Sequence, residues 1–181
     1  MFLKIKKIPK VNWSSNKSYN FKPKFSTSFF LCFGLMLFGL GEGLLIVSTT
    51  GASPWSVLAQ GISLNVNLSI GTITLLISLA VLILWIPLGQ KPGMGTIFNA
   101  LIIALMIDLC IKFVPTPSSY TYQFILAIFS VITVGIGGGI YLVSNLGAGP
   151  RDGLMIGLQK KTNLPIAAVR AFLEISVVSI G

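Results

Sequence analysis

Five long apolar blocks constrain the fold of this chain more than any other feature. The first four cover residues 29–47, 68–87, 95–113 and 122–143, and the fifth begins near residue 165 and continues to the last residue. Each of the first four is close to the ~20 residues that a helix needs to cross the ~30 Å hydrocarbon core of a bilayer. The sequence therefore predicts an all-α, polytopic membrane protein with about five transmembrane helices.

The composition supports a lipid environment. The mean hydropathy is +0.89, and only 9% of the 181 residues are charged, whereas a soluble domain usually carries about 25% charged residues. So few charges are insufficient for the surface of a soluble domain. We therefore interpret residues 28–181 as a single transmembrane domain.

The net charge of +9 is concentrated at the amino terminus. Seven of the thirteen basic residues are lysines within the first 24 positions: Lys4, Lys6, Lys7, Lys10, Lys17, Lys22 and Lys24. A basic surface for nucleic acid would be spread over the fold, so we expect no nucleic-acid partner. Residues 1–27 are interpreted as a basic cytoplasmic arm held near anionic lipid headgroups, and a solvated disordered tail is the alternative.

The remaining basic residues predict the orientation. With the amino terminus inside, the inside also receives Lys91, Arg151, Lys160 and Lys161. No Lys or Arg lies between residues 49 and 67, and only Lys112 borders the loop at 115–119. Because cytoplasmic loops carry an excess of Lys and Arg, we predict a multi-pass protein with a cytoplasmic amino terminus.

The sequence matches itself at a spacing of 96 residues. Gly39-Leu-Gly-Glu-Gly43 aligns with Gly135-Ile-Gly-Gly-Gly139, and Gly51-Ala-Ser-Pro54 aligns with Gly147-Ala-Gly-Pro150. We predict one repeat over about 28–114 and a partial second repeat over about 122–181. Because three spans, an odd number, separate the copies, the second copy is expected to be inverted in the membrane.

Each copy contains a turn and a short apolar segment. Gly51, Pro54, Gly147 and Pro150 are predicted to form structural turns, and the two prolines suit the first turn of a helix. The segments that follow, 53–64 and 152–161, are too short to span and are expected to be interfacial or re-entrant. The second copy is incomplete, because Gly181 aligns with Trp85. We therefore expect an intact form with six helices.

Three acidic residues lie inside the predicted spans: Glu42, Asp108 and Glu174. A charge near the bilayer centre costs at least ~2.5–3.5 kcal/mol on insertion scales, so each needs a partner. Asp108 with Lys112, and Arg170 with Glu174, are spaced to pair along one helix. Glu42 has no charged residue of opposite sign nearby in the sequence. We interpret it as the best candidate for a proton- or cation-coupled site, the alternative being a protonated glutamate bonded to a neighbouring helix.

Arg151 and Asp152 follow the second turn, where a helix is predicted to begin. An aspartate suits the positive end of a helix dipole. Arg151 is a candidate for binding an anionic substrate group or a lipid phosphate, with a simple positive-inside anchor as the alternative. The predicted substrate or coupling residues are therefore Glu42, Asp108, Arg151, Asp152, Arg170 and Glu174.

Several types of chemistry are not indicated. The chain has no histidine, and its two cysteines lie within apolar blocks, so neither a metal site nor a disulfide framework is expected. A nucleophile paired with a base is also missing from the sequence pattern. We expect no enzyme activity and no cofactor.

The turns, the loop before the third block and the charged residues together resemble a known family. The sequence resembles the YczE/YitT-type family of bacterial multi-spanning membrane proteins from about residue 29 to the last residue. The resemblance rests on Gly51-Ala-Ser-Pro-Trp55, Pro87, Lys91-Pro-Gly-Met-Gly-Thr96, Asn99, Asp108, Gly147-Ala-Gly-Pro-Arg-Asp-Gly-Leu-Met155, Arg170 and Glu174. It implies a protein of the bacterial plasma membrane whose biochemical role is undefined. Family members usually continue with a second Gly-x-Gly-Thr stretch and a last helix.

The leading functional hypothesis is a secondary transporter that moves a small solute by alternating access. Inverted repeats with short helix pieces at matching positions are typical of such proteins. The alternative is a non-transporting accessory or scaffold protein of a membrane-associated or secreted-product pathway. The expected partners are membrane lipids and a small-molecule or ion substrate, with a homodimer or a membrane partner left open.

Overall fold

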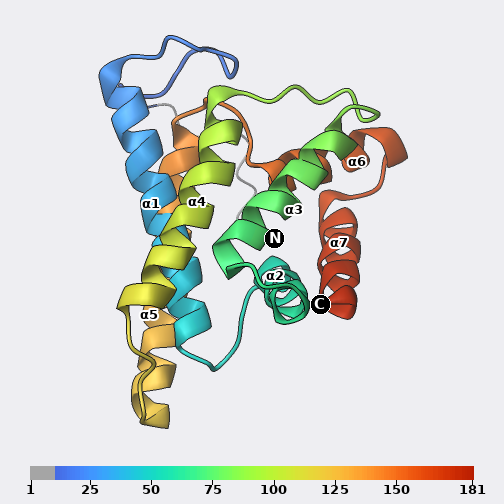
Figure 1. Ribbon diagram of the computed structural model, residues 1–181. Coiled ribbons are helices and arrows are strands. Elements are labelled where there is room, and N and C mark those ends of the chain that lie inside the picture. The colour runs from blue at the N-terminus through green and yellow to red at the C-terminus, as the bar shows by residue number, and fades with distance from the viewer. Residues whose placement is uncertain (1–10) are drawn as a thin grey trace, which may run out of the picture.

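The computed structural model describes residues 11–181, and this part of the chain is all-helical (Figure 1). Lys4, Lys6, Lys7 and Lys10 lie outside the described residues. The predicted all-α class is confirmed. The helices are α1 (Phe25–Val47), α2 (Pro54–Asn65), α3 (Ile70–Trp85), α4 (Met94–Phe113), α5 (Tyr120–Val143), α6 (Pro150–Thr162) and α7 (Ile166–Ile180).

The helix lengths refine the number of spans. Within the described residues, three helices are long and apolar enough to cross a membrane: α1, α4 and α5, with 23, 20 and 24 residues. The short helix α2 meets α3 at a bend of 115°, and together they form a fourth span if they are counted as one broken segment. Helices α3 and α7 have only 16 and 15 residues. The chain is therefore polytopic, with three or four spans by length rather than five.

The two short segments are helices, and they begin where the prolines predict. Pro54 and Pro150 are the first residues of α2 and α6. Proline suits this position because the first N–H groups of a helix have no intrahelical acceptor. Asp152 lies in the first turn of α6 and Lys160 and Lys161 in its last turn, which is the arrangement that the helix dipole favours.

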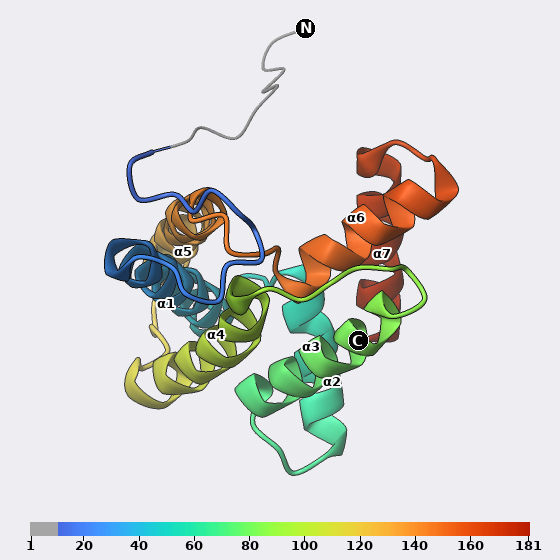
Figure 2. The same cartoon turned by 90° about the horizontal axis from the view of Figure 1, so that it is seen from above.

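Helix α1 is the centre of one half of the bundle, packed between α5 and α4 (Figure 2). Small residues bring the helices close together: a Cβ added at Gly34 would lie 2.7 Å from the backbone nitrogen of Tyr141 on α5, and one at Gly39 would lie 2.9 Å from the Cα of Ile103 on α4. In a bilayer such close packing replaces the hydrophobic driving force between helices. The core here consists of Leu31, Leu35, Ile103, Ile107, Tyr141 and Leu146.

The other half contains α2, α3, α6 and α7. Helix α2 packs against α7 and α3, and α6 packs against α3 and α7. Its core consists of Val81, Trp85 and Leu154, and the indole nitrogen of Trp85 donates to the carbonyl of Pro150 at 2.9 Å. Helix α3 also packs against α4 and so joins the two halves.

Helix boundaries recur at the spacing of 96 residues seen in the sequence. Helices α1 and α5 end at Val47 and Val143, α2 and α6 begin at Pro54 and Pro150, and α3 and α7 begin at Ile70 and Ile166. Thr49 and Asn145, which also match, are both left-handed, with φ of 56° and 53°. The helix contacts match as well. At this spacing α2 corresponds to α6 and α7 corresponds to α3, and both pairs, α2–α7 and α6–α3, are in contact.

The described part of the arm, residues 11–24, packs against the turn after α5. The Ser15 N–H donates to the Ser144 carbonyl at 3.0 Å, and the Asn145 amide donates to the Ser15 carbonyl at 2.8 Å. The Gly95 N–H at the start of α4 donates to the Leu146 carbonyl of the same turn. The arm, the start of α4 and the turn after α5 therefore lie at one end of the molecule, while contact of the arm with headgroups stays a prediction.

The outward faces of the helices are apolar. Large side chains such as Phe25, Ile83 and Ile132 are 86%, 65% and 54% exposed. Exposed apolar surface on this scale is unfavourable in water and neutral in hydrocarbon. These faces contact lipid.

Candidate functional site

Glu42 is a buried carboxylate held by the start of α2. It is 5% exposed, and its Oε2 atom accepts hydrogen bonds from the hydroxyls of Ser53 and Ser56, each at 2.7 Å. Gly41 and Gly43 flank it, and they let α5 and α4 approach α1 closely on either side. The carboxylate therefore has two hydroxyl donors and a rigid position.

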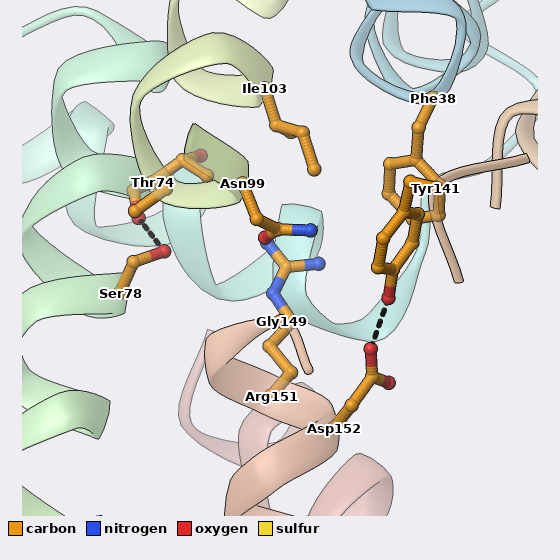
Figure 3. A pocket seen from close by; sticks show the side chains of 10 residues that line it. Phe38, Thr74, Ser78, Asn99, Ile103, Tyr141, Gly149, Arg151 and Asp152 are labelled. Carbon is orange, nitrogen blue, oxygen red and sulfur yellow. Dashed lines mark hydrogen bonds between the residues drawn. The ribbon is translucent and has the colours of Figure 1, made fainter. Parts of the chain in front are cut away.

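Arg151 brings a positive charge to the same region. Its guanidinium lies over the Trp55 ring, 5.2 Å from the ring centre, which is a cation–π distance. Glu42 and Asp152 line the same cavity as Arg151. The Tyr141 hydroxyl donates to Asp152 (Figure 3).

A cavity of about 360 Å³ joins these groups. It is lined by Glu42, Arg151, Asp152, Arg170 and Glu174, together with aromatic side chains that include Phe38, Trp55 and Tyr141. The structure thus gathers five of the six candidate residues, which come from α1, α6 and α7. The predicted pairing of Arg170 with Glu174 is confirmed, with Nε and Oε1 2.8 Å apart.

A second cavity, of about 80 Å³, shares Arg151, Asp152, Tyr141 and Phe38 with the first. Figure 3 shows the Arg151 side chain pointing toward Asn99 of α4, with Thr74 and Ser78 of α3 nearby. Thr74 and Ser78 donate to carbonyls of their own helix. They precede Arg170 and Glu174 by 96 residues, so matching positions of α3 and α7 line the two cavities.

Asp108 lies apart from these cavities, and its expected partner was wrong. Its Oδ1 atom accepts the N–H of Gly71 at 2.7 Å, and its Oδ2 atom accepts the Ser69 hydroxyl at 2.6 Å. Within residues 11–181, the salt bridge is the one between Arg170 and Glu174, so Asp108 and Lys112 are not paired. Because Gly71 has no side chain, α4 comes close enough for Asp108 to take the free donors at the start of α3.

Replacing Asp108 by alanine is expected to lower the free energy of unfolding by about 1–3 kcal/mol, because the Gly71 N–H loses its acceptor. Thermal unfolding in detergent, followed by tryptophan fluorescence, measures the effect. Lys112→Met is the control and is expected to change the free energy of unfolding by less than about 0.5 kcal/mol. Equal losses in both variants would contradict this assignment and favour the Asp108–Lys112 pair.

Sequence reasoning missed four residues of the site: Ser53, Ser56, Trp55 and Tyr141. One signal was present, because Ser56 and Asp152 occupy matching positions of the 96-residue alignment, as do Trp55 and Arg151. Tyr141 carried no such signal. Its partner Asp152 lies in the first turn of the next helix, α6. Among residues 11–181, no three His, Cys, Asp or Glu side chains gather closely enough to hold a metal ion.

An all-helical bundle with lipid-facing apolar surfaces and a charged cavity within it defines a polytopic membrane protein. Residues 25–181 match a family of unknown function, DUF6198, and the chain belongs to this family. The earlier resemblance is confirmed, because an uncharacterised membrane protein of Bacillus subtilis, YczE, is 30% identical over 80% of this chain and 68% of its own length.

Two further relatives extend the comparison. An uncharacterised protein of Haemophilus influenzae is 38% identical over 98% of this chain and 81% of its own length. The uncharacterised protein YyaS of Bacillus subtilis is 30% identical over 72% of this chain and 69% of its own length. No solved structure matches the chain.

Proposed function

We propose that this protein is a secondary transporter of the bacterial plasma membrane, with a cytoplasmic amino terminus, that moves a small solute by alternating access. The observation that carries the proposal is the charged cavity of about 360 Å³ around buried Glu42. Helices α1 and α2 contribute to it from the first half of the chain and α5, α6 and α7 from the second. Its volume is in the range of small-molecule sites.

The opposite directions of the matching helices α1 and α5 support this mechanism. Helix α1 begins beside the arm, whereas α5 ends there, with its Val143 carbonyl accepting the Ser14 hydroxyl at 2.7 Å. The matching helices thus run in opposite directions. In inverted-repeat transporters the solute binds where short helices of both halves meet, and in this protein the starts of α2 and α6 meet beside the cavity, through Trp55 and Arg151.

The charges in the cavity favour a solute that carries both an amino group and an acidic group. Arg170 and Glu174 neutralise each other, which leaves Glu42 and Asp152 facing one cation, Arg151. A guanidinium binds carboxylate or phosphate, and the carboxylates and the Trp55 ring suit an ammonium group. The proposal assigns no covalent chemistry to these residues.

Replacing Glu42 by glutamine is expected to reduce proton-driven uptake into proteoliposomes about a hundredfold, the lower end of the usual contribution of a positioned proton-transfer group. Glutamine still accepts the Ser53 and Ser56 hydrogen bonds, so the fold is retained. Lys112→Met, which changes a charge outside the cavity, is the control and is expected to transport normally. Uptake is measured for amino acids, organic acids and ions, and absence of flux for all of them in the wild type would sink the proposal.

One observation favours the alternative, a non-transporting accessory protein. Glu42 binds two hydroxyls at the start of α2, so its role under this alternative is to fasten α2 to α1. That function predicts an unchanged cellular phenotype for Glu42→Gln and stable co-purification with a membrane partner. The glutamine variant therefore separates the two functions.

A further inference from the structure

A third cavity, of about 290 Å³, lies at the end of the molecule where the arm packs. The arm, the loop between α3 and α4, the turn after α5, and α6 contribute to its wall, and Figure 1 shows these segments toward one end of the molecule. Its polar side chains are those of Ser18, Tyr19, Gln90, Lys91, Asn145 and Lys160. It shares Leu142 with the cavity around Glu42 and none of that cavity's charged residues. The third cavity is therefore a separate site.

The arm forms one side of this cavity through two hydrogen bonds to the turn after α5. The Ser18 hydroxyl donates to the side-chain oxygen of Asn145, and the Asn145 amide donates to the Ser15 carbonyl, each at 2.8 Å. Asn145 is left-handed, with φ of 53°, a conformation that asparagine adopts more readily than most residues. The turn thus presents its side chain to the arm and holds the arm in place as a wall.

One face of α6 forms another side. Residues 153, 156, 157 and 160 are spaced by three or four along the helix, so they share this face. A Cβ added at Gly153 would lie 1.9 Å from the Trp85 ring at the end of α3, and one at Gly157 would lie 3.0 Å from the Cγ of Gln90. The two glycines therefore let the loop between α3 and α4 lie directly against α6.

This contact brings two lysines from different segments to the same cavity. Lys91 comes from the loop, and Lys160 comes from the last turn of α6. Within residues 11–181 no acidic side chain lines the cavity, and neither lysine forms a salt bridge with another described residue. Like charges on a concave wall focus a positive potential into the space between them. The described residues supply no counter-charge, so an anionic ligand suits this position.

We propose that this cavity binds an anionic phosphate group. Lysine binds phosphate as a point charge, and basic pockets between transmembrane helices are typical sites for anionic lipid headgroups. Tyr19 and Gln90 add a hydroxyl and an amide that can donate hydrogen bonds. A phospholipid headgroup and free phosphate share this chemistry. Leu142, which also lines the cavity, is 43% exposed and offers an apolar surface to an acyl chain. The inference does not depend on transport or on the residues around Glu42.

Isothermal titration calorimetry of the full chain in nonionic detergent tests the proposal, with short-chain phospholipids that differ only in the headgroup. Phosphatidylglycerol is expected to bind saturably, and phosphatidylcholine, which has no net charge, is expected to bind about tenfold more weakly or worse. Lys91→Gln/Lys160→Gln is expected to weaken the binding of phosphatidylglycerol about thirtyfold, the combined effect of two lysines near an anionic group. Both lysines are exposed, so this variant folds, as thermal unfolding without lipid checks.

Lys24→Gln/Lys161→Gln is the matched control, because it removes two positive charges from the same end of the molecule. Lys161 follows Lys160 in the last turn of α6, and neither Lys24 nor Lys161 lines the cavity. The affinity of this control for phosphatidylglycerol is expected to stay within about twofold of the wild type, because exposed charges away from the phosphate are largely screened at physiological ionic strength.

Inorganic phosphate distinguishes the two sources of the ligand. If it binds without lipid and depends on Lys91 and Lys160, the site accepts free phosphate. If phosphatidylglycerol shows this dependence and inorganic phosphate does not displace it, the ligand is a lipid headgroup.

Three results would overturn the proposal. The first is that neither phosphatidylglycerol nor inorganic phosphate binds the wild type more tightly than Lys91→Gln/Lys160→Gln. The second is an equal loss of affinity in the control variant, which would indicate attraction to surface charge in general. The third is equal binding of the two phospholipids together with no binding of inorganic phosphate.

Discussion

Replacing Gly137 by leucine is expected to separate α5 from α1 and to cost about 3 kcal/mol of folding free energy, the upper end of the usual cost of overpacking. A Cβ at this position would lie 2.5 Å from the backbone nitrogen of Phe38 and 2.6 Å from the carbonyl oxygen of Gly34. Both neighbours are backbone atoms, which no rotamer change can move. The leucine therefore fits only if the two helices move apart.

The same helix offers a matched control. Gly135 is two residues away, and nothing lies within 4 Å of its added Cβ, so Gly135→Leu is expected to leave the stability of the isolated chain unchanged. Thermal unfolding and size-exclusion chromatography in detergent compare the two variants. Similar unfolding temperatures for both would show that the close α1–α5 packing is not formed in the protein.

Replacing Arg151 by methionine is expected to destabilise the protein by about 1–3 kcal/mol, the usual cost of leaving buried polar groups without compensation. Methionine keeps most of the apolar volume and removes the charge. Glu42 and Asp152 line the same cavity, and its other cation, Arg170, is paired with Glu174, so the two carboxylates lose their balancing charge. Uncompensated carboxylates in a lipid-surrounded bundle are costly, and the contact with the Trp55 ring is lost as well.

A double variant separates the charge effect from the loss of packing. If the unbalanced carboxylates cause the destabilisation, Arg151→Met/Asp152→Asn should recover a measurable part of the lost stability. The test is the difference in free energy of unfolding between the double variant and the sum of the single variants. Strict additivity, or a milder effect of Arg151→Met than of Lys112→Met, would contradict a compensating role for Arg151.

The sequence predicted local features well, because they depend on neighbours along the chain. Pro54 and Pro150 begin helices as expected, since a proline is compatible only with the first turn. Arg170 and Glu174 pair because a spacing of four places both side chains on one helix face. Helix α3 is shorter than the predicted span of 68–87, because apolar residues continue past the turn that ends this helix at Trp85.

The candidate site depended on contacts that spacing does not specify. Asp108 has Lys112 on its own helix, yet it binds the start of α3, because free N–H donors held close by Gly71 offset its charge better than an exposed lysine side chain. Ser53 and Ser56 are residue types that commonly occur at the start of a helix. Only the packing of α2 against α1 shows that their hydroxyls bind Glu42. Local pattern alone does not distinguish such partners.

The sequence by itself determined that the chain is an all-helical membrane protein, where its short helices begin and which positions match at a spacing of 96 residues. These properties follow from apolar length, proline geometry and identity in register, which need no tertiary contact. Only the tertiary structure decided which charges share a cavity, which partner Asp108 binds and which glycines of α5 lie against α1. Those outcomes depend on how closely helices pack when they are far apart in the sequence. The separation between two such helices is determined by the glycines on both of them.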